Sequence, residues 1–316
     1  MNTYNKLLLI IVCTISLYAA FLIFSDLKQI YEKIYSLKSV YYLPILVIAP
    51  LSWFVLFLRW HLLLKNLGIN IPKKDSFKIT LAGYALSITP GKVGELFKAH
   101  FVKTKFGISQ KNVMSVVVAE QFYTLMGLTI VGSIGILYFK FAPYVMIASA
   151  SFLVFIIIVL SSSLIFKKSS NLISKIPILS KYSSQFPDSQ VVIKSCFKKP
   201  IFVHATALSV IFWILESLIV YLVLLSFDLS TIHFFNLTSM YATSIIFGVI
   251  SFLPLGIGVV EGSLAGFLTL QGVNVTTSLI VVIMIRIFTR WYGVSIGLFA
   301  LKLVGGFSLN NNTAND

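Results

Sequence analysis

Residues 90–95 (PGKVGE) and 254–261 (PLGIGVVE) read as two versions of one motif. Each places Pro and Gly inside apolar sequence and ends on a glutamate, Glu95 or Glu261. Each is followed by a short amphipathic stretch that ends near a glycine, and then by a long apolar segment with a charge in its first half. Because interrupted apolar segments at matching places in two halves of a membrane protein point to a transport site, we expect these breaks to mark one.

The composition indicates an integral membrane protein. The chain has 316 residues, of which 58% are hydrophobic and 11% are charged, whereas soluble domains carry about 25% charged residues. A bilayer span needs roughly 20 apolar residues. We therefore expect an all-α fold with six spans, at about 6–25, 40–64, 113–138, 144–166, 201–226 and 277–304. The broken stretches 77–106 and 237–272 are expected to form two re-entrant helical hairpins of opposite orientation.

The distribution of lysines predicts the topology. The loop 167–200 holds seven lysines and the loop 227–236 holds none, so the first is expected in the cytoplasm and the second outside. This places both termini in the cytoplasm and puts the loop 26–39 outside despite its three lysines, Lys28, Lys33 and Lys38. The chain then forms a single membrane domain, 1–316, with an inverted repeat made of 40–138 and 201–304.

The net charge of +15 favours lipid partners over nucleic acid. The lysines lie in loops between apolar runs, where membrane topology accounts for them and where they can meet anionic headgroups. Cys13 lies in the first apolar run and Cys196 in a Lys-rich loop, so neither a disulfide nor a metal site is expected. We expect no cofactor and no nucleic-acid partner, and the oligomeric state is not readable.

Seven ionisable residues lie inside apolar segments, where each costs about 2.5–3.5 kcal/mol on insertion scales. They are Arg59, Glu95, Glu120, Glu216, Glu261, Arg286 and Arg290. Glu120 lies 25 residues after Glu95, and Arg286 lies 25 residues after Glu261. We expect Glu120 to pair with Arg286 or Arg290, which share a helix face and would leave positive charge for a phosphate headgroup.

Simpler interpretations of these charges remain open. Glu120 and Arg286 could form a purely structural ion pair. Arg290 stands beside Trp291 and Tyr292, an aromatic pair typical of the headgroup level, so an interfacial place is favoured for it. Snorkelling to the surface is slightly favoured for Arg59. Glu216 has no evident partner.

The breaks themselves offer backbone groups to a ligand. In the first break a helix that begins near residue 93 would present free N–H groups to an anion, aided by Lys92 and Lys98. Glu95, after Gly94, could instead cap that helix. In the second break, Gly256 and Gly258 permit either close approach to a ligand or tight helix packing, with equal weight.

The order of motifs resembles a known family. The chain shows LRWHLL at 58–63, PGKVGE, AEQ at 119–121, PLGIGVVEG at 254–262 and Ile-Arg at 285–286. This order resembles the flippase-like family, the lysylphosphatidylglycerol synthase transmembrane region, over about residues 7–305. The resemblance implies a polar intramembrane set at Arg59, Gly94, Glu95, Glu120, Glu261 and Arg286.

Two departures from the family pattern bear on function. Aminoacyl-transferring members carry a soluble domain after the membrane part, whereas a short Asn-rich stretch follows Ser308 here. We therefore expect no lysylphosphatidylglycerol synthesis. The common Glu-Arg pair of the family is Glu120-Gln121 in this chain, so the partner of Glu120 is open.

These observations favour translocation of an anionic or amphipathic lipid, or of a lipid-linked intermediate, across the cytoplasmic membrane. One alternative is a non-catalytic accessory protein that works with a glycosyltransferase or another lipid-synthesising enzyme. A membrane-embedded transferase is a weaker alternative, since no catalytic motif is found. The sequence does not name the lipid, the direction or the energy source.

Overall fold

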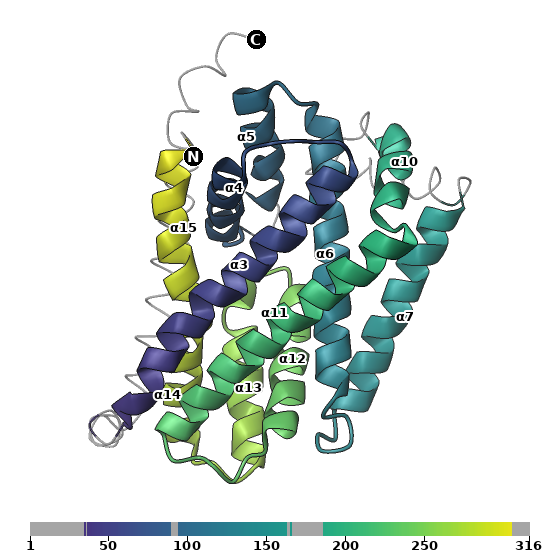
Figure 1. Ribbon diagram of the computed structural model, residues 1–316. Helices are drawn as coiled ribbons and strands as arrows, with labels where there is room; N and C mark the ends of the chain where they lie inside the picture. Colours follow the sequence, from purple (N-terminus) through teal and green to yellow (C-terminus); the bar gives the residue numbers. More distant parts are fainter. Residues whose placement is uncertain (1–34, 36, 90–93, 163–164, 166–185, 305–316) are drawn as a thin grey trace.

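The structure is a computed structural model that describes residues 35, 37–89, 94–162, 165 and 186–304 (Figure 1). Five sequence predictions lie wholly or mostly outside these residues: the first span at 6–25, the loop 26–39, Lys92 with the rest of 90–93, the Lys-rich loop, and the Asn-rich stretch after Ser308. Throughout the described ranges the regular elements are helices. The all-α fold is confirmed.

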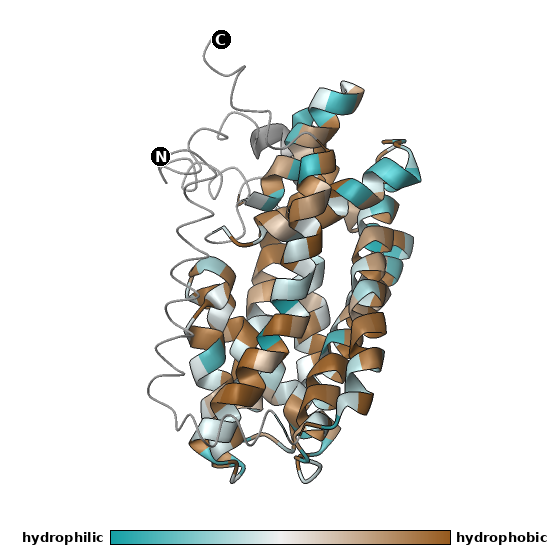
Figure 2. Cartoon of the chain, turned by 90° about the vertical axis from the view of Figure 1, so that its left-hand side faces the viewer, coloured by the Kyte–Doolittle hydropathy of each residue, from teal (hydrophilic) through white to brown (hydrophobic). Residues whose placement is uncertain are grey.

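Five helices in the described part are long and apolar enough to cross a membrane. They are α3 (Tyr42–Asn66) with the preceding 3-10 turn η1 (Ser39–Tyr41), α6 (Gln110–Ser133), α7 (Ala142–Ser161), α11 (Lys199–Ser226) and the continuous series α14 (Val275–Arg286), η5 (Ile287–Trp291) and α15 (Tyr292–Leu303). Figure 2 shows hydrophobic residues along much of their length. The expected spans match these helices with shifts at the ends, the clearest at 134–138, which forms turns instead of the end of α6.

The two broken stretches form helix pairs, as expected. The first pair is α4 (Lys73–Leu86) and α5 (Phe97–Phe106), and the second is α12 (Phe234–Ile250) and α13 (Val259–Leu270). Figure 1 shows the first pair at one end of the bundle and the second at the other end. Leu255 of the second break packs against the small apolar cluster that contains Ile88, two residues before the first break.

Helices α3 and α11 cross and pack closely through contacts that are reciprocal. Arg59 of α3 donates to Ser209 of α11 at 2.8 Å, and Ser52 of α3 donates to Glu216 of α11 at 3.4 Å. The serine and the charged residue are seven positions apart on each helix. Such an exchange of equivalent positions is the contact pattern that a two-fold axis produces.

Glycines on α6 allow neighbouring helices to approach closely. A Cβ atom at Gly127 would lie 2.7 Å from the backbone carbonyl carbon of Ser209 on α11. At Gly132 it would lie 2.7 Å from the side chains of Ala242 and Met146. Small residues at helix contacts are the usual route to tight packing in a bilayer, where the hydrophobic effect does not drive helices together.

Basic residues gather at one end of the bundle. Lys65, Lys103, Lys105, Lys194 and Lys302 lie in the last turns of α3, α5, α10 (Phe186–Cys196) and α15, and these turns share one end in Figure 1. At the opposite end, Lys38 forms an ion pair of 2.6 Å with Asp228 in the loop after α11. Lys38, one of the three lysines that fitted the predicted topology poorly, therefore has a carboxylate beside it.

We predict that Gly127→Ala lowers the stability of the protein. The added methyl group meets the α11 backbone, and overpacking of this kind costs about 1–3 kcal/mol. The midpoint of thermal unfolding in detergent should fall. Gly266→Ala on α13 is the matched control, because a Cβ there meets no atom within 4 Å and helix propensity alone favours Ala by about 1 kcal/mol. Equal midpoints for the two variants would contradict close packing at Gly127.

Candidate functional site

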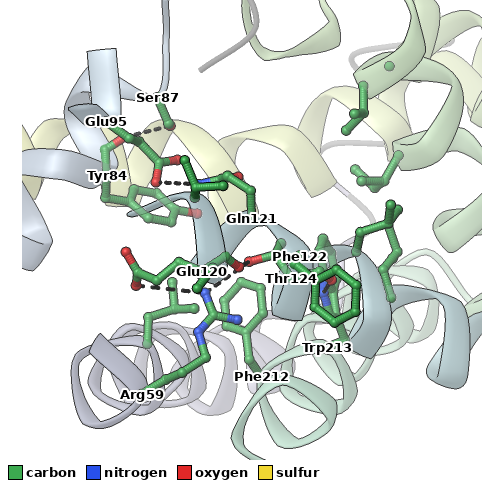
Figure 3. Close-up of a pocket in the computed structure, with 18 of the residues that line it drawn as sticks. Arg59, Tyr84, Ser87, Glu95, Glu120, Gln121, Phe122, Thr124, Phe212 and Trp213 are labelled. Atoms are coloured by element: carbon green, nitrogen blue, oxygen red, sulfur yellow. Dashed lines mark hydrogen bonds and ion pairs between the residues drawn. The ribbon is translucent and has the colours of Figure 1, made fainter. Parts of the chain in front are cut away.

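A central cavity of about 430 Å³ lies where the two breaks meet, and residues on both sides of both breaks line it. One end is polar. It is built by residues of α3, α4 and α6, by Glu95 just before α5, and by Arg290. The other end is apolar and extends between α7, α10 and the second break. We call this second part the apolar arm. Figure 3 shows the polar end with its charged side chains.

Glu120 is the centre of the polar end. Its carboxylate contacts the Lys98 ammonium and lies 3.9 Å from a guanidinium nitrogen of Arg59. Lys98 also lies 3.8 Å from Glu95, whose carboxylate accepts a hydrogen bond of 2.9 Å from Gln121. The expected pairing of Glu120 with Arg286 or Arg290 is therefore wrong, because two cations of its own half of the chain already surround it.

Lys98 reaches Glu120 by a defined route across α4. A Cβ atom at Gly83 would lie 2.5 Å from the Lys98 side chain, so the glycine leaves the space that the aliphatic stem fills. The ammonium lies 4.5 Å from the ring centroid of Trp60 on α3. Contacts with a carboxylate and with an aromatic face both stabilise a buried cation.

Arg59 does not snorkel to the surface. Its residue is only 3% exposed, and its terminal nitrogens donate to Ser209 at 2.8 Å and to Thr124 at 2.9 Å. The Nε atom is buried without a hydrogen-bond partner among the described residues. Arg59 thus joins α3, α6 and α11 at the cavity and keeps one donor unused.

Arg286 belongs to the second break. Its Nε donates to Glu261 at 2.7 Å, and Nη2 donates to the Leu255 carbonyl at 2.7 Å. Glu261 also accepts from the Gly258 amide at 2.7 Å, as a carboxylate in the first turn of a helix commonly does. Since Leu255 has a φ of +52°, a conformation costly for an L-residue, this ion pair holds a strained turn.

Arg290 binds elsewhere, although it follows Arg286 by four residues. It lies 3.5 Å from Glu216 of α11 and donates to the Tyr84 hydroxyl at 2.9 Å. Arg286 ends α14, whereas Arg290 lies within the π-helical turn η5 that follows directly. Four residues do not complete such a turn, so the arginines do not share a face as predicted. Arg290 is mostly buried instead of interfacial.

Glu216, for which the sequence offered no partner, is fully buried. Besides Arg290, it accepts hydrogen bonds from Tyr241 at 3.2 Å and from Ser52 at 3.4 Å. Its partners come from α3, α12 and η5, all distant in sequence. Periodicity within one helix could not have indicated them.

The predicted excess of positive charge is not present among the described site residues. Each of the four cations has a carboxylate within 4 Å: Lys98 and Arg59 with Glu120, Arg286 with Glu261, and Arg290 with Glu216. Of these, the Glu261–Arg286 pair lies outside the cavity wall. The charged residues that line the cavity are Glu95, Lys98, Glu120, Arg59 and Arg290.

Gly94, Gly256 and Gly258, the glycines of the breaks within the described ranges, make close packing or backbone contacts. The Gly94 amide donates to Thr89 at 2.6 Å, and a Cβ there would lie 2.3 Å from the Leu86 carbonyl oxygen. Gly256, with a φ of +67°, packs on Gly248. Gly258 has a φ of +84° and gives its amide to Glu261. These contacts favour the packing interpretation at Gly94 and Gly258, whereas Gly256 also lines the central cavity, where a ligand can reach it.

Several polar residues of the cavity were missed by sequence reasoning. They are Tyr84, Thr89, Gln121, Thr124 and Trp213. Thr124 and Gln121 follow Glu120 on α6, and a search for polar residues one turn from an intramembrane charge would have found Thr124. The others depend on contacts between distant helices and leave no such signal.

Comparison with known proteins is consistent with this architecture. The family described as the lysylphosphatidylglycerol synthase TM region matches residues 8–297. This chain belongs to that family. The chain is also 23% identical over 325 residues to a protein of Methanothermobacter thermautotrophicus called UPF0104 membrane protein, and the match covers 94% of this chain and 95% of the relative. The lysylphosphatidylglycerol synthase TM region is thus present over nearly the whole length of this multi-pass membrane protein.

Double-mutant cycles test the observed pairing. We predict that Glu261→Gln and Arg286→Gln each reduce the free energy of unfolding by about 3–5 kcal/mol, because each leaves a buried charge unpaired. The Glu261→Gln/Arg286→Gln double variant should lose clearly less free energy of unfolding than the sum of the two single losses. In contrast, the losses in free energy of unfolding caused by Glu120→Gln and by Arg286→Gln should be additive within about 0.5 kcal/mol, since the two residues share no contact among the described interactions. Strong coupling of Glu120 to Arg286, measured by unfolding in mixed detergent, would restore the pairing expected from sequence.

Proposed function

We propose that this protein translocates a lipid, or a lipid-linked intermediate, with an anionic or amphipathic headgroup across the cytoplasmic membrane. The headgroup would cross through the polar end of the central cavity while the acyl chains follow the apolar arm. The proposal assigns no chemical reaction to the chain. The observation that carries it is the composition of the cavity wall, which joins both breaks, a charged cluster and an apolar arm in one space.

The charged cluster suits a phosphate-bearing headgroup. Arg59 and Lys98 both contact Glu120, so a phosphate can bind the two cations when the Glu120 side chain turns away from them. The unused Nε of Arg59 provides one further donor. Guanidinium groups match phosphate geometry well because their donors lie in a planar fork. The balanced charges also explain how the empty site tolerates burial.

The apolar arm suits an acyl chain. Phe152, Ile156 and Ile193 line it, and Phe252, another lining residue of the cavity, is 72% exposed. An exposed aromatic at this depth is favourable only against lipid or another apolar surface. A polar end joined to an apolar arm matches an amphipathic ligand in a way that a site for a soluble ion would not.

The helix arrangement supports alternation between two sides of the membrane. We propose that α4–α5 and α12–α13 are re-entrant hairpins and that 40–138 and 201–304 form an inverted repeat, as the reciprocal contacts of α3 and α11 suggest. The Lys-rich end would face the cytoplasm by the positive-inside rule. A midplane site at the interface of inverted repeats permits exposure to either side by rocking of one repeat against the other.

A steric block of the arm tests the proposal. In proteoliposomes with a phosphatidylglycerol that is fluorescent on its acyl chain, the wild type should expose inner-leaflet label to an added quencher. We predict that Ile156→Trp slows this exposure by about tenfold, since overpacking costs about 1–3 kcal/mol. Ile158→Trp is the matched control, because residue 158 lies on the same helix, is exposed and lines no part of the cavity.

Two results would count against the proposal. If the wild type transports no faster than empty liposomes, the transport role fails and an accessory role beside a lipid-synthesising enzyme becomes the better account. If the Ile156→Trp and Ile158→Trp variants transport equally well, the central cavity is not the route.

A further inference from the structure

A second hollow of about 400 Å³ lies against the central cavity, and we call it the outer chamber. It is lined by Ile157, Leu160, Lys194, Phe197 and Phe202, from α7, α10 and α11 and the junction between the last two. Leu160 and Phe197 line the central cavity as well. The two hollows are therefore separated there by one leucine and one phenylalanine side chain, which we call the partition.

The helix on one side of the partition is loosely held. Helix α7 lies at the edge of the bundle in Figure 1, and only 17% of its apolar window is buried, the lowest share of the five candidate spans. Near its last turn, the Leu160 carbonyl accepts a hydrogen bond of 2.9 Å from Gln190 of α10.

The helix on the other side is firmly anchored. Tyr123 of α6 donates to the Cys196 carbonyl at 2.6 Å, and Asn66 of α3 donates to the Ser195 carbonyl at 3.1 Å. Phe197 packs on the rings of Phe122 and Tyr123, with centroid distances of 4.7 and 5.6 Å. Movement at the partition is thus expected from α7 and Leu160, with Phe197 fixed.

The chemistry of the outer chamber matches an anionic phospholipid. Of the five lining residues within the described ranges, four are apolar, the fifth is Lys194, and none is a carboxylate. Lys198 and Lys199 follow four and five residues later without lining the chamber, and all three lysines are exposed. The hollow lies next to a helix that faces the bilayer. Its apolar side chains attract acyl chains, and the lysine at its edge attracts an anionic headgroup.

We infer that the outer chamber is a binding site for anionic phospholipid and the lateral entrance to the central cavity. The phosphate lies at Lys194, the acyl chains pack on Ile157 and Phe202, and the lipid enters when Leu160 moves away from Phe197. The entrance role rests on the proposed transport function, whereas the binding role does not.

Binding can be measured without transport. A bimane fluorophore on Phe202→Cys, in a Cys13→Ser background, reports lipid in the chamber, and the native Cys196 stays unlabelled because burial raises the pKa of its thiol to about 12. We expect phosphatidylglycerol with brominated chains to quench the label at about fivefold lower concentration than the matched phosphatidylcholine, the ratio expected for one nearby lysine. Lys194→Gln should remove this difference. Equal quenching by both lipids in the Lys194 protein would overturn the site.

Entry is tested by Ile157→Trp, which narrows the outer chamber without facing the central cavity. In the liposome assay it should slow transport of phosphatidylglycerol at least about fivefold relative to Ile158→Trp. If the Ile157→Trp variant transports phosphatidylglycerol at the wild-type rate, the outer chamber is not the entrance, while the transport function stands. Absence of transport by the wild type, with selective quenching still present, would overturn the entrance and the transport function but not the lipid site.

Discussion

The structure depends on one constraint: a cation buried among apolar helices needs a carboxylate of the same chain beside it. Breaking a buried pair costs about 3–5 kcal/mol, which is a large part of the stability of a typical domain. In the described residues this constraint joins helices that are far apart in sequence. Glu216–Arg290 joins α11 to η5, and Glu120 joins α6 to α3 and α5.

The same constraint makes the two halves of the molecule unequal. In the second half, Glu261 pairs directly with Arg286, the arginine 25 residues later, and neither residue lines the cavity. In the first half the residue at the matching distance from Glu95 is Glu120, and two carboxylates cannot pair. Lys98 lies between them instead, and this group stays on the cavity wall. The charge of one residue, negative at Glu120 and positive at Arg286, thus distinguishes a candidate binding group in the first half from a structural ion pair in the second.

Much of the fold follows from local sequence. Apolar length predicts the spans, and Pro with Gly predicts the two broken helix pairs, because both signals lie within a single element. The ion pairs could not be predicted in this way. The error at Arg286 and Arg290 arose from the assumption of regular helix geometry through residues 287–291, where a π-helical turn separates the two side chains. The burial of Arg59 depends on Ser209 and Thr124, which only the tertiary structure brings together.

The central claim is that a lipid occupies the cavity with its headgroup at the polar end. An electron cryo-microscopy structure of the protein in lipid nanodiscs tests this most directly. The account predicts elongated density that begins near Arg59 and Lys98 and continues along Phe152 and Ile156 toward the bilayer. A cavity that is closed to the bilayer and empty of acyl-chain density in every class would contradict it.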